Sequence, residues 1–127
     1  RVLFRSLLDS SFIIALFHSE DQHHHVAKEL EKNGARFIAS TLSITEVMPR
    51  AIKNSIAPLI SGALDLLVDE FVDITGEVAH LAAEFRAHKG LKTPDSIIAA
   101  TAQIHKAELW TFDAKLAKAT PGARCLA

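Results

Sequence analysis

The sequence predicts an α/β protein, a three-layer α/β/α sandwich in which helices cover both faces of a mainly parallel sheet. The first observation is that strand-like and helix-like segments alternate along the 127 residues, as in chains whose strands are joined by helical crossovers. The second is that the strand-like segments are almost wholly apolar, which is typical of strands buried on both faces. Residues 2–8 are the first such segment, with Val, Leu and Phe in little alternation.

The expected strands are short apolar runs bounded by polar or turn residues. In chain order they span residues 2–8, 36–39, 70–74, 108–112 and 124–126. The expected helices have apolar residues three and four positions apart, or begin and end at capping residues. They span residues 12–17, 21–32, 43–53, 56–68, 77–88, 94–106 and 113–118. We expect all of these elements to form one domain over residues 1–127, which is long enough to bury a substantial core.

Several helix ends carry recognisable signals. Residues 43–46, Ser-Ile-Thr-Glu, match a capping box, in which the serine caps the helix and the glutamate bonds back to it. Thr93 is expected to cap the helix in which Pro94 takes the first position. Residues 33–34, Asn-Gly, end the second helix. Pro49 falls inside the third helix, where it predicts a kink or a shifted boundary.

The composition excludes several classes of protein. With 49% hydrophobic and 23% charged residues, the chain is of the globular and not the disordered type. The formal net charge of −1 gives no global basic field, so any contact with nucleic acid must come from a local patch. The single Cys125 excludes a disulfide framework within the chain, and we expect a cytoplasmic location. No apolar run is long enough to span a bilayer, so no membrane contact is expected.

Asp95 is the first candidate site residue. It sits in the first turn of its helix, where a carboxylate gains from the helix dipole. The residues three, four and seven positions further on are Ile98, Ala99 and Ala102, so Asp95 heads the apolar stripe of the helix. A carboxylate at the rim of a buried face costs free energy unless something compensates for it.

Three further acids follow expected strands. Asp9 follows the first strand, Glu46 lies just after the second, and Asp113 follows the fourth. Because ligands of open α/β sheets bind beyond the carboxyl ends of the strands, we expect these acids and Asp95 to meet at one edge. Each acid taken alone is also explained as a helix cap or helix-dipole partner. Together they would repel one another, and a divalent cation such as Mg²⁺ or Mn²⁺ is the simplest compensation.

Four short motifs in fixed order carry a family resemblance. They are Asp-Ser-Ser at residues 9–11, Thr-Glu-Val at 45–47, Thr-Pro-Asp-Ser-Ile-Ile-Ala-Ala-Thr-Ala at 93–102 and Leu-Trp-Thr-Phe-Asp at 109–113. With them, nearly the whole chain resembles PIN-domain nucleases, above all the VapC-type toxins of type II toxin–antitoxin pairs. Ser11 stands where the family often has Asn, and Phe112 where a polar residue is common.

The resemblance implies an activity and a set of site residues. The implied activity is Mg²⁺-dependent endonucleolytic cleavage of RNA, with Mn²⁺ as a substitute, restrained by a cognate antitoxin. Ser11 and Thr111 would make supporting contacts on the substrate side. The implied catalytic and metal-binding acids are Asp9, Glu46, Asp95 and Asp113.

Basic side chains near the acids are the candidates for binding RNA. Arg50 and Lys53 lie four and seven residues after Glu46, on the same face of its helix. Contacts of such residues with phosphate would position RNA and make binding depend on salt. For each residue, a solvated charged surface is the alternative.

Two other features have less specific interpretations. The apolar face of residues 56–67 is wider than one helix usually buries, which indicates a homodimer interface or additional core packing. The run of three histidines at residues 23–25 cannot grip one ion from a helix, because consecutive side chains point about 100° apart. We expect that run to be a solvated helix start.

Two other functions remain open from the sequence. A non-catalytic PIN-like module could engage RNA or a partner protein without cleaving anything. A metal phosphatase acting on small phosphoesters could use the same acids. Binding of Mn²⁺ and the choice of substrate would distinguish these from a ribonuclease.

Overall fold

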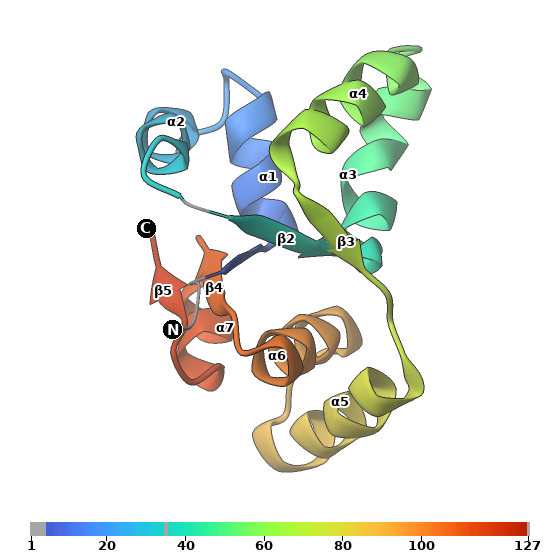
Figure 1. The fold of residues 1–127 in the computed structure, drawn as a ribbon, viewed down its shortest axis with the longest axis vertical. Helices are drawn as coiled ribbons and strands as arrows, with labels where there is room; N and C mark the ends of the chain where they lie inside the picture. Colours follow the sequence, from blue (N-terminus) through green and yellow to red (C-terminus); the bar gives the residue numbers. More distant parts are fainter. Residues whose placement is uncertain (1–4, 35, 127) are drawn as a thin grey trace.

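The computed structural model describes residues 5–34 and 36–126, and its centre is a five-stranded sheet. The strands are β1 (Ser6–Leu8), β2 (Phe37–Ser40), β3 (Glu70–Val72), β4 (Glu108–Thr111) and β5 (Arg124–Cys125). Their order across the sheet is β3-β2-β1-β4-β5, and each neighbouring pair is parallel. Because every pair is parallel, the carboxyl ends of the strands lie at one edge of the sheet, whose strands are labelled in Figure 1.

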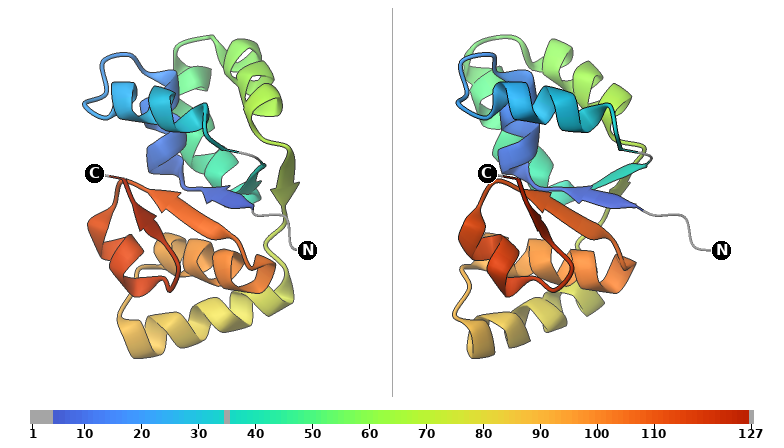
Figure 2. Two further views of the ribbon diagram at one scale, coloured as in Figure 1. Left: turned by 60° about the vertical axis from the view of Figure 1, so that its left-hand side comes forward. Right: turned by 90° about the vertical axis from the view of Figure 1, so that its left-hand side faces the viewer.

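Helices cover both faces of this sheet (Figure 2). They are α1 (Ser10–Phe17), α2 (His24–Glu31), α3 (Thr41–Lys53), α4 (Ala57–Leu67), α5 (Gly76–Lys89), α6 (Thr93–His105) and α7 (Ala114–Ala119). The first four pack on one face, and the last three on the other. The predicted three-layer α/β/α sandwich is confirmed. None of the helices in the described part of the chain is long and apolar enough to cross a membrane.

The core is divided by the alternation of side chains along the strands. Leu7 and Leu109, which are register partners in β1 and β4, pack against α5, α6 and α7. Their neighbours Leu8 and Trp110 point the other way, toward α1 and the helices around it. Burying each large aliphatic side chain contributes about 1.5–3 kcal/mol. These two clusters hold the strand ends in register and so fix the positions of the loops that follow them.

The predicted start of α3 is wrong. The helix begins at Thr41, and its N-cap is Ser40, whose hydroxyl accepts a hydrogen bond from the Leu42 N–H at 3.1 Å. Strand β2 thus runs directly into the helix, and the capping box expected at residues 43–46 does not form. Pro49 lies inside α3 without ending it. As a consequence Glu46 projects from the second turn of the helix and not from its cap.

Other boundaries differ by smaller amounts. Helix α6 begins at Thr93, so its N-cap is Lys92 and not Thr93 as predicted. Helix α2 begins at His24, because the Asp21 carboxylate accepts the His23 N–H at 2.8 Å and forms a turn before it. Of the first expected strand, residues 2–4 lie outside the described part of the chain.

Candidate functional site

The four acids singled out in the sequence lie around the carboxyl edge of the sheet, and we call them the acidic edge. Asp9 directly follows β1, and Asp113 lies two residues beyond the end of β4. Each of the two caps the helix that comes next. Glu46 is on α3, which follows β2, and Asp95 is in the first turn of α6. The β1–β4 register fixes Asp9 beside the end of β4, since its N–H donates to the Trp110 carbonyl at 3.1 Å.

Asp9 is held by three hydrogen bonds. Its side chain is 6% exposed. Oδ1 accepts the Ser10 N–H at 2.8 Å, while Oδ2 accepts the hydroxyls of Ser11 at 2.9 Å and Thr111 at 2.7 Å. A buried carboxylate needs such donors to offset its lost hydration. The residue is therefore fixed in one orientation by groups from the start of α1 and the end of β4, which are about a hundred positions apart in sequence.

The two hydroxyls are themselves oriented by the chain that leaves β4. The Phe112 N–H donates to Ser11 Oγ at 3.1 Å, and the Asp113 N–H donates to Thr111 Oγ1 at 3.0 Å. Each hydroxyl thus accepts one bond from the backbone and donates its own proton to Asp9. Two successive backbone amides after β4 determine where the Asp9 carboxylate points.

Glu46 lies within the electric field of two other acids. Partial burial raises the pKa of its carboxyl above the ordinary value of 4.5, and the negative charges of Asp9 and Asp95 raise it further. A hydrogen bond from the Ser10 side chain acts in the opposite direction. Ser10 thus touches both Asp9 and Glu46. Ser10 was not among the residues expected at the site, although its place directly after Asp9 was a usable signal.

Asp95 lies within the electric field of both acids and cations. Burial raises the pKa of its carboxyl above 3.8, followed by the charges of Asp113 and Asp9. The cations Lys92 and Lys115 lower it in part. The negative charge of Asp9 thus acts on both Glu46 and Asp95.

The family follows from a comparison over most of the chain. A sequence model of the PIN domain matches residues 6–120. The chain belongs to the PIN domain family. That match covers all four acids, Ser11 and Thr111. No curated protein matches the sequence.

Solved structures resemble this PIN domain over nearly its whole length. A toxin–antitoxin complex from Klebsiella pneumoniae has a TM-score of 0.84 at 29% identity, covering 96% of this chain and 98% of that one. VapC20 from Mycobacterium tuberculosis, a sarcin–ricin loop cleaving toxin, has a TM-score of 0.78 at 19% identity, and the match covers 94% of this chain and 98% of VapC20. VapBC2 from Rickettsia felis, bound to a DNA fragment from its promoter, has a TM-score of 0.70 at 20% identity, and the match covers 94% of this chain and 96% of that one. The latter two similarities establish the fold alone.

The donor chemistry of the acidic edge in this PIN domain fits a hard divalent cation. Within residues 5–34 and 36–126, no three His, Cys, Asp or Glu side chains are grouped closely enough to hold a metal ion between them. Mg²⁺, however, binds through one or two carboxylates and retains several waters. The negative charge of Asp9 raises the pKa of both Glu46 and Asp95, in addition to the larger effect of burial, and such repulsion between acids is what a bound cation offsets.

The other predicted site residues divide into two groups. Thr111 is 0% exposed and Ser11 is half-buried, and both bond to Asp9, so they support an acid and do not project toward the surface. Arg50 and Lys53 are exposed in the last turn of α3, on the side of the helix that carries Glu46. The hydroxyls of Ser11 and Thr111 thus orient Asp9, while the exposed cations lie on the helix that carries Glu46.

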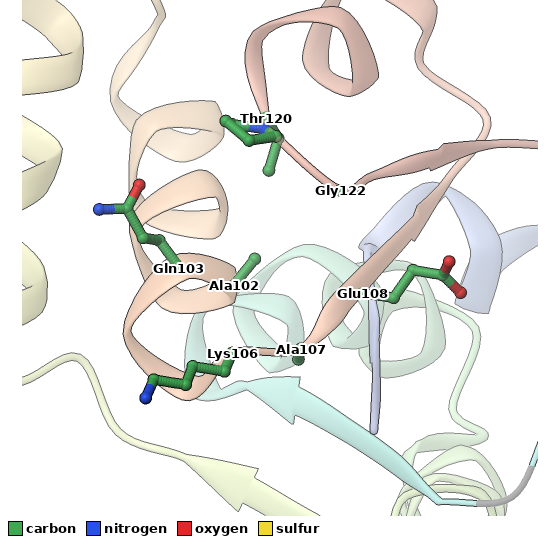
Figure 3. Close-up of a pocket in the computed structure, with 8 residues that line it drawn as sticks. Ala102, Gln103, Lys106, Ala107, Glu108, Thr120 and Gly122 are labelled. Atoms are coloured by element: carbon green, nitrogen blue, oxygen red, sulfur yellow. The ribbon is translucent and has the colours of Figure 1, made fainter. Parts of the chain in front are cut away.

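A separate cavity of about 340 Å³ lies elsewhere on the molecule (Figure 3). It is formed by the end of α6, the start of β4 and the turn after α7. Its lining residues are Ala102, Gln103, Lys106, Ala107, Glu108, Thr120, Pro121 and Gly122. Because β4 begins here and ends at Thr111, this cavity is at the opposite edge of the sheet from the four acids.

Proposed function

We propose that this PIN domain is a Mg²⁺-dependent endoribonuclease and the toxin of a toxin–antitoxin pair. The observation that carries the proposal is Asp9, which is fixed by three hydrogen bonds and whose negative charge helps to raise the pKa of Glu46 and Asp95. PIN domains are nucleases in general, and the Klebsiella pneumoniae neighbour at 29% identity is a toxin–antitoxin complex. VapC20, a neighbour of the same fold, is a sarcin–ricin loop cleaving toxin.

In this proposal Asp9, Glu46, Asp95 and Asp113 hold Mg²⁺, with Mn²⁺ as a substitute. When bound, the cation supplies Lewis-acid stabilisation of charge on the phosphodiester and makes water a better nucleophile at neutral pH. Ser11 and Thr111 keep the Asp9 carboxylate turned toward the site. Glu46 or Asp95 takes the proton from the attacking water, because a raised pKa brings a carboxylate closer to the pH at which it must act as a base.

The substrate is held by local cations, since the chain as a whole carries a net charge of −1. Arg50 and Lys53 contact phosphates on one side of the acidic edge. Lys92 and Lys115, whose positive charges lower the pKa of Asp95, are further candidates for phosphate contacts. Binding of RNA therefore weakens as salt concentration rises.

The partners of the protein in this proposal are RNA, a cognate antitoxin and a second copy of the chain. The antitoxin is supported by the toxin–antitoxin neighbour. The homodimer is supported by apolar side chains that α4 leaves exposed, among them Leu59 and Leu66. Copurification of this chain from the cells in which it naturally occurs tests for a small partner protein.

The decisive variant is Asp95→Asn, tested on a pool of structured RNAs with Mg²⁺. We expect cleavage to fall at least about a hundredfold, the size seen when a group acting in the transition state is removed. Circular dichroism should show an intact fold. Asp65→Asn on α4, an exposed acid far from the sheet edge, is the matched control and should cleave normally. Unchanged cleavage by Asp95→Asn would refute the mechanism.

The same preparations distinguish the two alternative functions. A non-catalytic binding module need not bind Mn²⁺ at the acidic edge and cleaves no RNA. A phosphatase turns over p-nitrophenyl phosphate and leaves RNA intact. Mn²⁺ binding lost in Asp95→Asn, together with RNA cleavage and no turnover of the small ester, supports the ribonuclease.

A further inference from the structure

We propose that His23, at the start of α2, is a positioning residue for the acidic edge, acting through Phe112. The expected effect on RNA cleavage rests on the proposed function, whereas the structural link from His23 to Asp9 does not. It also assigns a role to the histidine run at residues 23–25, which the sequence alone left as a solvated helix start.

The contact between the two rings is close and nearly parallel. The ring centroids of His23 and Phe112 are 4.2 Å apart, and the planes differ by 6°. Phe112 is also stacked with Phe12 of the core, at 6.0 Å and 11°. Both His23 and Phe112 are half-buried. The first side chain after β4 is thus fixed between the core and α2 by ring contacts.

Fixing the Phe112 ring also fixes its backbone amide. That amide donates to Ser11 Oγ at 3.1 Å, and the Ser11 hydroxyl donates to Asp9 Oδ2 at 2.9 Å. Three contacts therefore lead from His23 to Asp9. If the stack is removed, the segment after β4 gains freedom, and the orientation of the Asp9 carboxylate is less well defined.

The histidine is well placed for this contact. Its backbone N–H is bound by the Asp21 carboxylate at 2.8 Å, and its ring makes no capping bond to α2. The adjacent His24 uses Nδ1 to contact the Ala15 carbonyl at 2.8 Å, which ties α2 to α1. His25 is exposed. Two of the three histidines thus attach α2 to the rest of the molecule, and the third is a natural control.

The contact requires a flat ring and no particular nitrogen, which suggests three variants. His23→Ala removes the stack, His23→Phe preserves it, and His25→Ala is the matched control on the same helix. Hydrogen exchange of the Phe112 amide, followed by NMR without metal or RNA, measures the positioning directly. RNA cleavage then measures its consequence for kcat and KM.

We expect the Phe112 amide to exchange about two- to tenfold faster in His23→Ala, which corresponds to losing one aromatic pair. The amide of Ala99, inside α6, should be unaffected. In His23→Ala, kcat should fall by a similar factor while KM for RNA stays the same. His23→Phe should restore both values, and His25→Ala should resemble the wild type.

Unchanged exchange at Phe112 in His23→Ala would overturn the inference, as would a His23→Phe variant no better than His23→Ala. Faster exchange with unchanged kcat would also overturn it, because positioning would then have no consequence for the site. A wild-type protein that cleaves no RNA, with the expected exchange pattern in the variants, would instead refute the proposed function alone and leave the structural link intact.

Discussion

At the scale of single residues, the acidic edge is an arrangement that works against the stability of the fold. Burial and neighbouring charges raise the pKa of both Glu46 and Asp95. The folded state therefore binds protons at these groups more readily than the unfolded state does. Their ionised forms penalise folding at neutral pH, and protonation relieves the penalty. Such strain is expected where charges are kept together for a ligand.

Glu46→Gln should therefore stabilise the metal-free protein at pH 7. Glu46 is exposed to solvent, which screens its repulsion with the other acids. We therefore expect a rise in melting temperature of only about 2 °C. The gain should be complete above the raised pKa, shrink as pH falls toward 4.5 and vanish below it, where both states are protonated.

Thermal unfolding over a pH series, with and without Mg²⁺, checks this prediction. Added Mg²⁺ should stabilise the wild type more than the variant and so reduce the difference. Glu84→Gln on α5, an exposed glutamate outside the acidic edge, should show no such pH dependence. A wild type that is more stable than Glu46→Gln at pH 7 would contradict the electrostatic account.

At the scale of elements, the junction between β2 and α3 determines where Glu46 is presented. Ser40 is completely buried and ends the strand, and its hydroxyl caps the helix at once. Ser43, which the sequence pattern favoured as the cap, is buried in the first turn, and its hydroxyl has no hydrogen-bond partner within the described residues. The two serines are three positions apart and have opposite energetic roles.

The variants Ser40→Ala and Ser43→Ala should therefore differ clearly. Loss of the Ser40 cap should lower the free energy of unfolding by about 1 kcal/mol. Loss of the unpartnered Ser43 hydroxyl should be neutral or stabilising, since no hydrogen bond is lost and a buried polar group is removed. Urea denaturation of both variants provides the measurement. A larger cost for Ser43→Ala would restore the capping box inferred from the sequence.

At the scale of the whole molecule, α4 leaves an apolar surface exposed at the outside of the sandwich. Leu59 and Leu66 are 68% and 91% exposed, and they lie seven residues apart on one side of the helix. Leu59 belongs to the apolar face of residues 56–67, for which the sequence predicts either an interface or additional core packing. The structure buries Leu64 and Leu67 and leaves the other side of the helix for an interface, which is consistent with the proposed homodimer.

Leu66→Lys should shift the protein from dimer to monomer, because a charge would be buried in the centre of the contact. Sedimentation velocity over a concentration series measures the change. Val26→Lys on α2 is the control, since Val26 is an exposed apolar residue on a different helix. A wild type that remains monomeric over the whole series would exclude this interface.

The sequence by itself determined the order of the elements, the parallel sheet and the neighbourhood of Asp9 and Asp113, because each depends on a local pattern of burial or on the end of a strand. Tertiary structure decided what the pattern could not encode. The bond from Thr111 to Asp9, the raised pKa of Glu46 and the stack of His23 on Phe112 join segments that meet only through the register of β1 with β4 and the packing of helices on them. The physical reason is that a side chain's neighbours along the chain fix its secondary structure, whereas its field and its hydrogen-bond partners come from whatever the folded core brings beside it.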